Sequence, residues 1–152
     1  MSNIKQIAFV EADKYVVAKP YYGLAPFKPP QTFKTSYGTF YDTGDYVINA
    51  GFLFSANFPA INTFETRRAA CVHDFYYCLM KDGHLDRSYR DDADYLLHTM
   101  LIEDGVNPIR AAWWLTAVRI GGDKALNSPA PKVQYSPSAD EVPDINRHVG
   151  LV

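Results

Sequence analysis

The stretch RRAACVHDFYY, residues 67–77, decides how the rest of the chain is interpreted. It lies in a run whose apolar residues recur with the 3.6-residue period of an α-helix, and it places His73 and Asp74 among apolar and aromatic neighbours. Polar side chains are costly to bury unless they are paired or hydrogen-bonded. The pair is therefore expected to hold a metal ion, to take part in chemistry, or to join two helices.

The helical period continues to both sides of this stretch and predicts three helices, over residues 62–80, 88–104 and 108–120. Each is expected to begin at a capping residue and to stop at glycine. The capping residues are Asn62, Ser88 and Asn107, the last followed by Pro108, and the glycines are Gly83, Gly105 and the pair Gly121-Gly122.

Before the helices, the chain is rich in β-branched and aromatic runs that are broken by Pro and Gly, which is typical of short strands. These runs cover residues 7–11, 15–19, 32–41 and 46–56. They predict a small N-terminal antiparallel sheet and, with the helices, an α+β fold. We expect one domain over residues 1–122, strand-rich to residue 60 and helical from residue 62.

Two proline-rich segments are expected to be extended and to contact neighbouring subunits. The first, residues 19–30, presents its aromatic residues outward or folds them back onto the core, and the sequence does not decide between the two. The second is an arm over residues 123–152. The candidate partner-binding residues are Tyr21, Tyr22, Phe27 and Tyr135.

Composition excludes several classes of partner. The formal net charge is −2 and Arg67-Arg68 is the largest basic cluster, so nucleic acid is not an expected ligand. No apolar run reaches the roughly 18 residues of a membrane span, and the N-terminus does not resemble a signal peptide, so synthesis in the cytoplasm is expected. Cys71 and Cys78 are expected to be reduced core residues.

Polar residues spaced four apart line one face of each of the first two helices. His73 and Tyr77 share a face of the first helix, and Arg90, Asp94 and His98 form a stripe on the second. If the stripes meet, one outcome is a buried network of His73, Asp74, Arg90 and Asp94 that fixes the two helices. The other is a zinc or manganese site with ligands from His73, Asp74, Asp94 and His98, in which catalytic candidates are His73, Asp74, Tyr77 and Asp94. The network is favoured over the metal site.

Three motifs in order resemble the phage and prophage proteins grouped as domain-of-unknown-function family 1353. They are AAxxHDxxY at residues 69–77, RxxAD at residues 90–94, and Met100 followed by AVRxxG at residues 117–122. The resemblance implies a tailed-phage origin and a hydrolase-like fold. In the family an acidic residue follows the Gly-Phe of the preceding strand, whereas this chain has Ser55, so the implied site is incomplete.

These observations favour a structural or accessory virion protein of the tail or baseplate region, made in the host cytoplasm and bound to other phage proteins or to further copies of itself. No cofactor is expected under this hypothesis. Two alternatives remain open. One is a metal-dependent hydrolase that acts on the host cell wall during entry or lysis, and the other is a phage assembly chaperone that is absent from finished particles.

Overall fold

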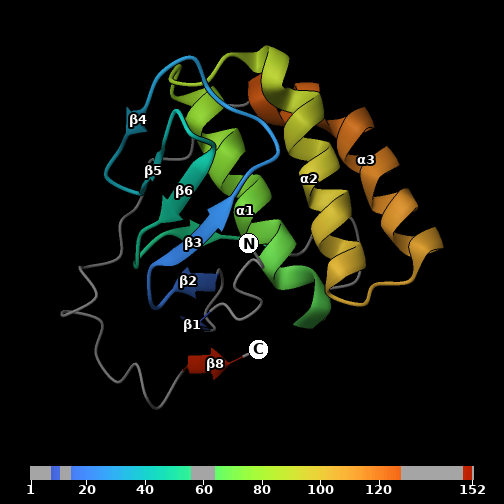
Figure 1. Ribbon diagram of the computed structural model, residues 1–152. Coiled ribbons are helices and arrows are strands. Elements are labelled where there is room, and N and C mark those ends of the chain that lie inside the picture. The colour runs from blue at the N-terminus through green and yellow to red at the C-terminus, as the bar shows by residue number, and fades with distance from the viewer. Residues whose placement is uncertain (1–7, 11–14, 56–63, 128–148, 152) are drawn as a thin grey trace. The chain divides into compact units, whose positions relative to one another are not determined.

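The computed structural model describes residues 8–10, 15–55, 64–127 and 149–151, and the chain divides into two compact units. One unit, residues 1–55 and 132–152, contains the strands, and the other, residues 56–131, contains the helices (Figure 1). Antiparallel sheets precede three helices, so the predicted α+β class is confirmed.

The larger part of the strand unit is a four-stranded antiparallel sheet in the order β3-β6-β5-β4. Its strands are β3 (Tyr21–Leu24), β4 (Phe33–Lys34), β5 (Gly38–Phe40) and β6 (Asp45–Ile48). Alternate residues point to opposite faces of a strand. One face of this sheet therefore carries the fully buried side chains of Tyr21, Phe40, Tyr46 and Ile48.

A second antiparallel sheet has the order β7-β2-β1-β8. It contains β1 (Ala8–Val10), β2 (Tyr15–Val17), β7 (Leu53–Phe54) and β8 (Val149–Leu151). The pairing of β1 with β8 sets Ala8 opposite Leu151, so the two most distant described segments of the chain are neighbours.

The structure has two antiparallel sheets where one was predicted, and turns divide two of the predicted strands. Residues 32–41 form a hairpin, in which the Thr35 hydroxyl donates to the Gly38 carbonyl at 2.6 Å. Residues 46–56 are broken at Gly51, whose φ of 95° is favourable only for glycine. In addition, β3 lies inside the segment that was expected to be an extended loop.

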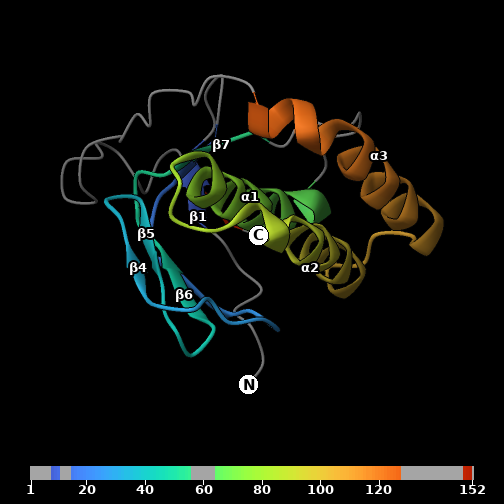
Figure 2. The same cartoon turned by 90° about the horizontal axis from the view of Figure 1, so that it is seen from above.

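The helical unit contains α1 (Phe64–Lys81), the short 3₁₀ helix η1 (Arg87–Tyr89), α2 (Arg90–Glu103) and α3 (Pro108–Asn127). The three α-helices run up, down and up, with α2 packed against both α1 and α3 (Figures 1 and 2). Their apolar stripes meet inside the unit, as the 3.6-residue pattern predicted.

Two of the predicted helix boundaries need correction. Asp86, rather than Ser88, is the capping residue of this segment, since its carboxylate accepts a hydrogen bond from the Ser88 amide at 2.8 Å and Ser88 lies within η1. Gly121 and Gly122 do not end α3, which continues to Asn127, so residues 123–127 of the predicted arm are helical. Asn62 and residues 128–148 lie outside the described residues.

The remaining boundary signals are confirmed. Gly83 and Gly105 follow α1 and α2 with φ of 78° and 91°, the left-handed conformation that commonly ends a helix. The Asn107 side chain accepts a hydrogen bond from the Ile109 amide at 2.9 Å and so caps α3. Within the described ranges, every helix is too short or too polar to cross a bilayer.

Candidate functional site

Helix α1 brings His73 and Tyr77 together, one turn apart on the same face. Their ring centroids are 4.1 Å apart and the ring planes make an angle of 37°. Both polar tips point to α2, where they meet the same carboxylate.

That carboxylate belongs to Asp94 on α2. Its Oδ1 atom accepts a hydrogen bond from the Tyr77 hydroxyl at 2.8 Å and lies 2.7 Å from Nε2 of His73. Because an ionised carboxylate can only accept, Nε2 of His73 is the donor in this contact. Asp94 thus joins α1 to α2 through two short contacts on one oxygen.

Arg90 extends the network to α3. Its Nε lies 3.8 Å from the second oxygen of Asp94, its Nη1 donates to Asp123 at 2.5 Å, and its Nη2 donates to the Arg119 carbonyl. We call His73, Tyr77, Arg90 and Asp94 the polar cluster. Through it all three helices are connected.

The guanidinium of Arg90 reaches α3 because residue 122 is glycine. A Cβ atom on Gly122 would overlap the guanidinium, at 2.6 Å from Nη2. The two successive glycines predicted to stop α3 therefore include one that admits an arginine from the neighbouring helix.

Burial limits what the polar cluster can do chemically. The Asp94 side chain has no exposed surface, and the side chain of His73 is 11% exposed. A substrate cannot meet the Asp94 carboxylate in this arrangement. The contacts of the cluster link three helices: His73 and Tyr77 of α1 meet Asp94 of α2, and Arg90 of α2 reaches α3.

The four candidate metal ligands do not come together. His73 and Asp94 are in contact, Asp74 is half-buried on α1, and His98 is half-buried one turn beyond Asp94. Across the part of the chain that the structure describes, no three His, Cys, Asp or Glu side chains are grouped as metal ligands.

Two ionisable groups of α1 have shifted pKa values. Burial, followed by the charge and hydrogen bond of Asp94, raises the pKa of Tyr77 well above its usual value. Burial, followed by the charge of Asp74, raises the pKa of the Cys71 thiol. Cys71 and Cys78 are both free, but only Cys71 is a core residue, since Cys78 is half-buried. A buried thiol with a raised pKa is a poor nucleophile.

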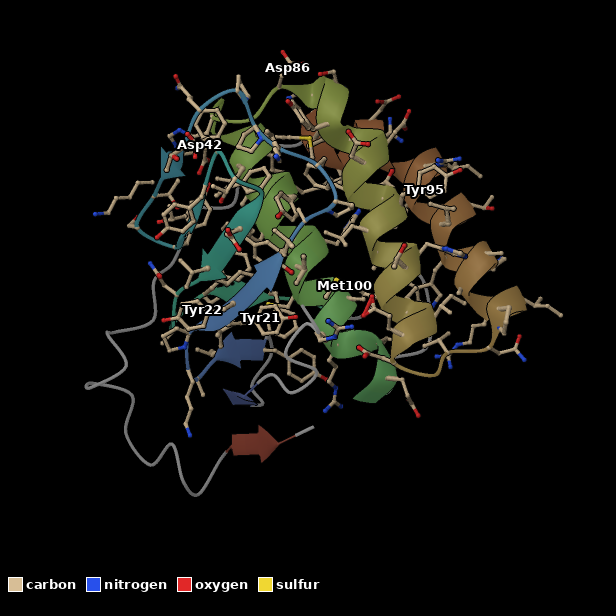
Figure 3. All side chains as sticks on the ribbon, in the orientation of Figure 1. Tyr21, Tyr22, Asp42, Asp86, Tyr95 and Met100 are labelled. Atoms are coloured by element: carbon tan, nitrogen blue, oxygen red, sulfur yellow. The ribbon has the colours of Figure 1, made fainter. Side chains whose placement is uncertain are left out.

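The aromatic residues of segment 19–30 divide between core and surface. Tyr21 is buried against Tyr46 and so follows the alternative in which the aromatic residues fold back onto the core. Its neighbour Tyr22 leaves β3 on the opposite side and is 55% exposed (Figure 3). Phe27 is half-buried and stands edge-on to Phe40, with 5.7 Å between ring centroids. Tyr135 lies outside the described residues.

A second ion pair in the helical unit was not predicted. Arg68 on α1 is 1% exposed and donates to both oxygens of Asp104, at 2.8 and 3.1 Å, and to Glu103 at 3.2 Å. The signal in the sequence was the pair of acidic residues at the C-terminal end of α2, where the helix dipole disfavours negative charge unless a cation is close.

Arg87 supplies a helix cap that was also not predicted. It donates to the Leu126 carbonyl at 2.8 Å and to the Asn127 side chain at 2.6 Å. The last carbonyls of a helix lack partners within the helix, so this arginine from η1 closes the C-terminal end of α3.

Comparison of the chain with protein-family models, with curated proteins and with solved structures finds no match. The functional argument therefore rests on the residues of this chain and on the motifs quoted above.

Proposed function

We propose that this chain is a structural or accessory virion protein of a tailed phage, located in the tail or baseplate region. The observation that carries the proposal is the complete burial of Asp94, whose carboxylate meets His73 and Tyr77 of α1. A carboxylate that is buried and bonded to Tyr77 and His73 serves the fold, and the hydrolase-like site implied by the family 1353 motifs is then a remnant. The motifs themselves support the phage origin.

The strand unit offers a surface for contact with other virion proteins. Tyr22, Leu24 and Tyr41 are 55%, 39% and 42% exposed. Tyr22 and Leu24 are two residues apart on β3 and therefore share a face of the sheet. Leu24 is paired with Asp45 on β6, and the Asp45 carbonyl accepts a hydrogen bond from the Tyr41 amide, so Tyr41 lies on the same face. Exposed aromatic side chains are enriched at protein interfaces.

Quantitative mass spectrometry of purified phage particles tests the proposal. We expect the chain at a fixed ratio to a known tail protein, such as a multiple of three or six. Absence from particles would overturn the proposal and leave the hydrolase or the assembly chaperone as the candidate function.

A matched pair of variants tests the surface itself. Replacement of Tyr22, Leu24 and Tyr41 by alanine is expected to reduce incorporation into particles. Lys34→Ala changes another exposed side chain of the same unit and is expected to leave incorporation unchanged. Equal incorporation of the two variants would show that the contacts are made elsewhere.

A further inference from the structure

Helix α3 carries a stripe of apolar side chains on its outer face. Ile109, Trp113 and Ile120 are 82%, 52% and 80% exposed. Spacings of four and seven residues place them on one face of the helix, opposite the buried Ala111, Trp114 and Val118. Contiguous exposed apolar residues of this kind mark interaction surfaces.

Helix α2 carries a complementary stripe. Tyr95 and Ile102 are 55% and 40% exposed, and the exposed Thr99 lies between them on the same face. Asp91 and Asp92, one turn before Tyr95, add negative charge at the N-terminal end of this stripe. On α3 the exposed Lys124, one turn after Ile120, adds positive charge at the C-terminal end.

The two helices are antiparallel neighbours, and their contacts show which residues are level with one another. The Arg119 guanidinium lies 4.6 Å from the centre of the Tyr95 ring, on the side of α2 that faces α3 (Figure 3). Arg90, the first residue of α2, pairs with Asp123, four residues after Arg119 on α3. Ile120, the residue after Arg119, is therefore at the height of Tyr95 along the helix axes.

We propose that two copies of this chain form a dimer through these faces, with a two-fold axis parallel to α2 and α3. Such a rotation keeps every residue at its own height and lays α2 of one copy antiparallel to α3 of its partner. Residues that are level within one chain are then level across the interface. The contact is self-complementary, as a two-fold interface must be.

The register of this pairing follows from the helical rise of about 1.5 Å per residue. Tyr95 faces the partner's Ile120, and seven residues further along α2, Ile102 faces the partner's Trp113. Thr99 faces the partner's Thr116 between them. The same register brings Asp91 and Asp92 to the partner's Lys124, so apolar and charged groups match together.

This matching favours a second copy over another occupant. An unrelated helix would need an apolar stripe with positive charge at one end for α2 and another with negative charge for α3. A second copy supplies both with the correct spacing. The arrangement places two helices against two, as in the core of a four-helix bundle. It does not depend on the proposed virion function.

The first test is the mass of the full chain in solution, measured by sedimentation and light scattering. We expect twice the 17.1 kDa of one chain. Ile120→Glu is expected to give the monomer mass with an unchanged helical circular dichroism signal. Tyr22→Glu, an equally drastic change at an exposed site of the other unit, is expected to remain dimeric. A monomeric wild-type chain, or a dimeric Ile120→Glu chain, would overturn the inference.

The second test addresses register and does not require Ile120→Glu to fold. Thr99→Cys and Thr116→Cys are prepared separately and oxidised alone or after mixing. A disulfide-linked dimer is expected in the mixture and in neither variant alone, because each threonine faces the other type in the partner. Cys71 and Cys78 are present in every sample, so a disulfide that involves either of them would also appear when each variant is oxidised alone. Absence of the mixed product would contradict the antiparallel pairing.

Discussion

Asp94 is the member of the polar cluster whose side chain has no exposed surface. Its side chain is fully buried and meets a hydroxyl, an imidazole and a guanidinium. Removal of one partner from a buried charged network is strongly destabilising, because the charges left behind stay out of water. We expect Asp94→Asn to lower the free energy of unfolding by about 3–5 kcal/mol, measured by urea denaturation.

The matched control for this change is Asp42→Asn. Asp42 is an exposed carboxylate of the strand unit (Figure 3), so the same chemical substitution is expected to change stability by less than about 0.5 kcal/mol. Similar losses for the two variants would mean that the polar cluster contributes little to stability.

Tyr77 gives the polar cluster a dependence on alkaline pH. Burial, and then Asp94, raises the pKa of the folded-state hydroxyl above the unfolded value of about 10. The protonated hydroxyl therefore stabilises the folded chain fully at pH values below the unfolded-state pKa. This contribution is lost as the pH rises from the unfolded-state pKa through the higher folded-state pKa. The free energy of unfolding is expected to fall more steeply from pH 9 to pH 11 in the wild type than in Tyr77→Phe.

The phenylalanine variant is also informative at neutral pH. It keeps the ring but removes a hydrogen bond to a charged acceptor, which contributes about 1.5–3 kcal/mol. Cys71 has a raised pKa in both proteins, so its titration cancels in the comparison. Parallel pH profiles would show that Tyr77 does not titrate differently in the folded state.

At the scale of the helix, Gly122 determines how α2 meets α3. In an exposed helix, Gly→Ala stabilises by about 1 kcal/mol. Here the added methyl group would push the Arg90 guanidinium away from its acceptors on α3. Gly122→Ala is therefore expected to destabilise the chain, measured by thermal unfolding.

The Arg90→Ala background supplies the control. Without the guanidinium, Gly122→Ala is expected to stabilise by about 1 kcal/mol, as helix propensity alone predicts. A change of the same sign in both backgrounds would contradict the close contact between Gly122 and Arg90.

The same residue shows where sequence patterns reach their limit. Glycine commonly ends a helix, so Gly121-Gly122 predicted the end of α3. Gly122 instead leaves space for the guanidinium of Arg90, which lies 32 positions earlier in the chain. A periodic pattern of apolar residues gives no information about such a distant contact. The stripe of Arg90 and Asp94 was visible because the spacing is local. His98 continues the stripe but is not a member of the polar cluster, because the spacing of residues along a helix does not predict how deeply each one is buried.

Long-range pairing accounts for the other differences. Arg68 was predicted only as a basic residue, because its partners Glu103 and Asp104 lie 35 and 36 residues away. The existence and type of the three helices were predictable from the apolar period, and the start of α3 also from its capping residue Asn107. The division of the strands into two sheets depends on contacts between β1 and β8, which no local pattern indicates.

For the whole molecule, the division into two units predicts separable stability. A chain that ends at Asn127 keeps α1, α2, α3 and the Arg87 cap but loses β8. We expect amide exchange to remain slow in the helices and to become faster in β1, since β1 loses one of its two neighbouring strands. Faster exchange in all three helices would indicate that the units do not fold independently.

The proposed virion function adds a second expectation for this shortened chain. It is expected to retain the helical unit and yet to be excluded from particles, because the predicted contacts of residues 128–152 are gone. Immunoblotting of purified particles, with the full chain expressed at the same level, measures this. Normal incorporation would remove the C-terminal segment from the list of virion contacts.

The pairing of β1 with β8 also has a consequence for the order of folding. The residues of the helical unit, 56–131, are synthesised one after another, so their contacts can form early. Ala8 can pair with Leu151 only after almost the whole chain has been synthesised. Closure of so long a loop costs entropy before it gains any hydrogen bond, and such contacts slow folding. During synthesis, therefore, the helices have time to assemble while the second sheet is still open, and the edge of β1 is exposed to chaperones or to other chains for that interval.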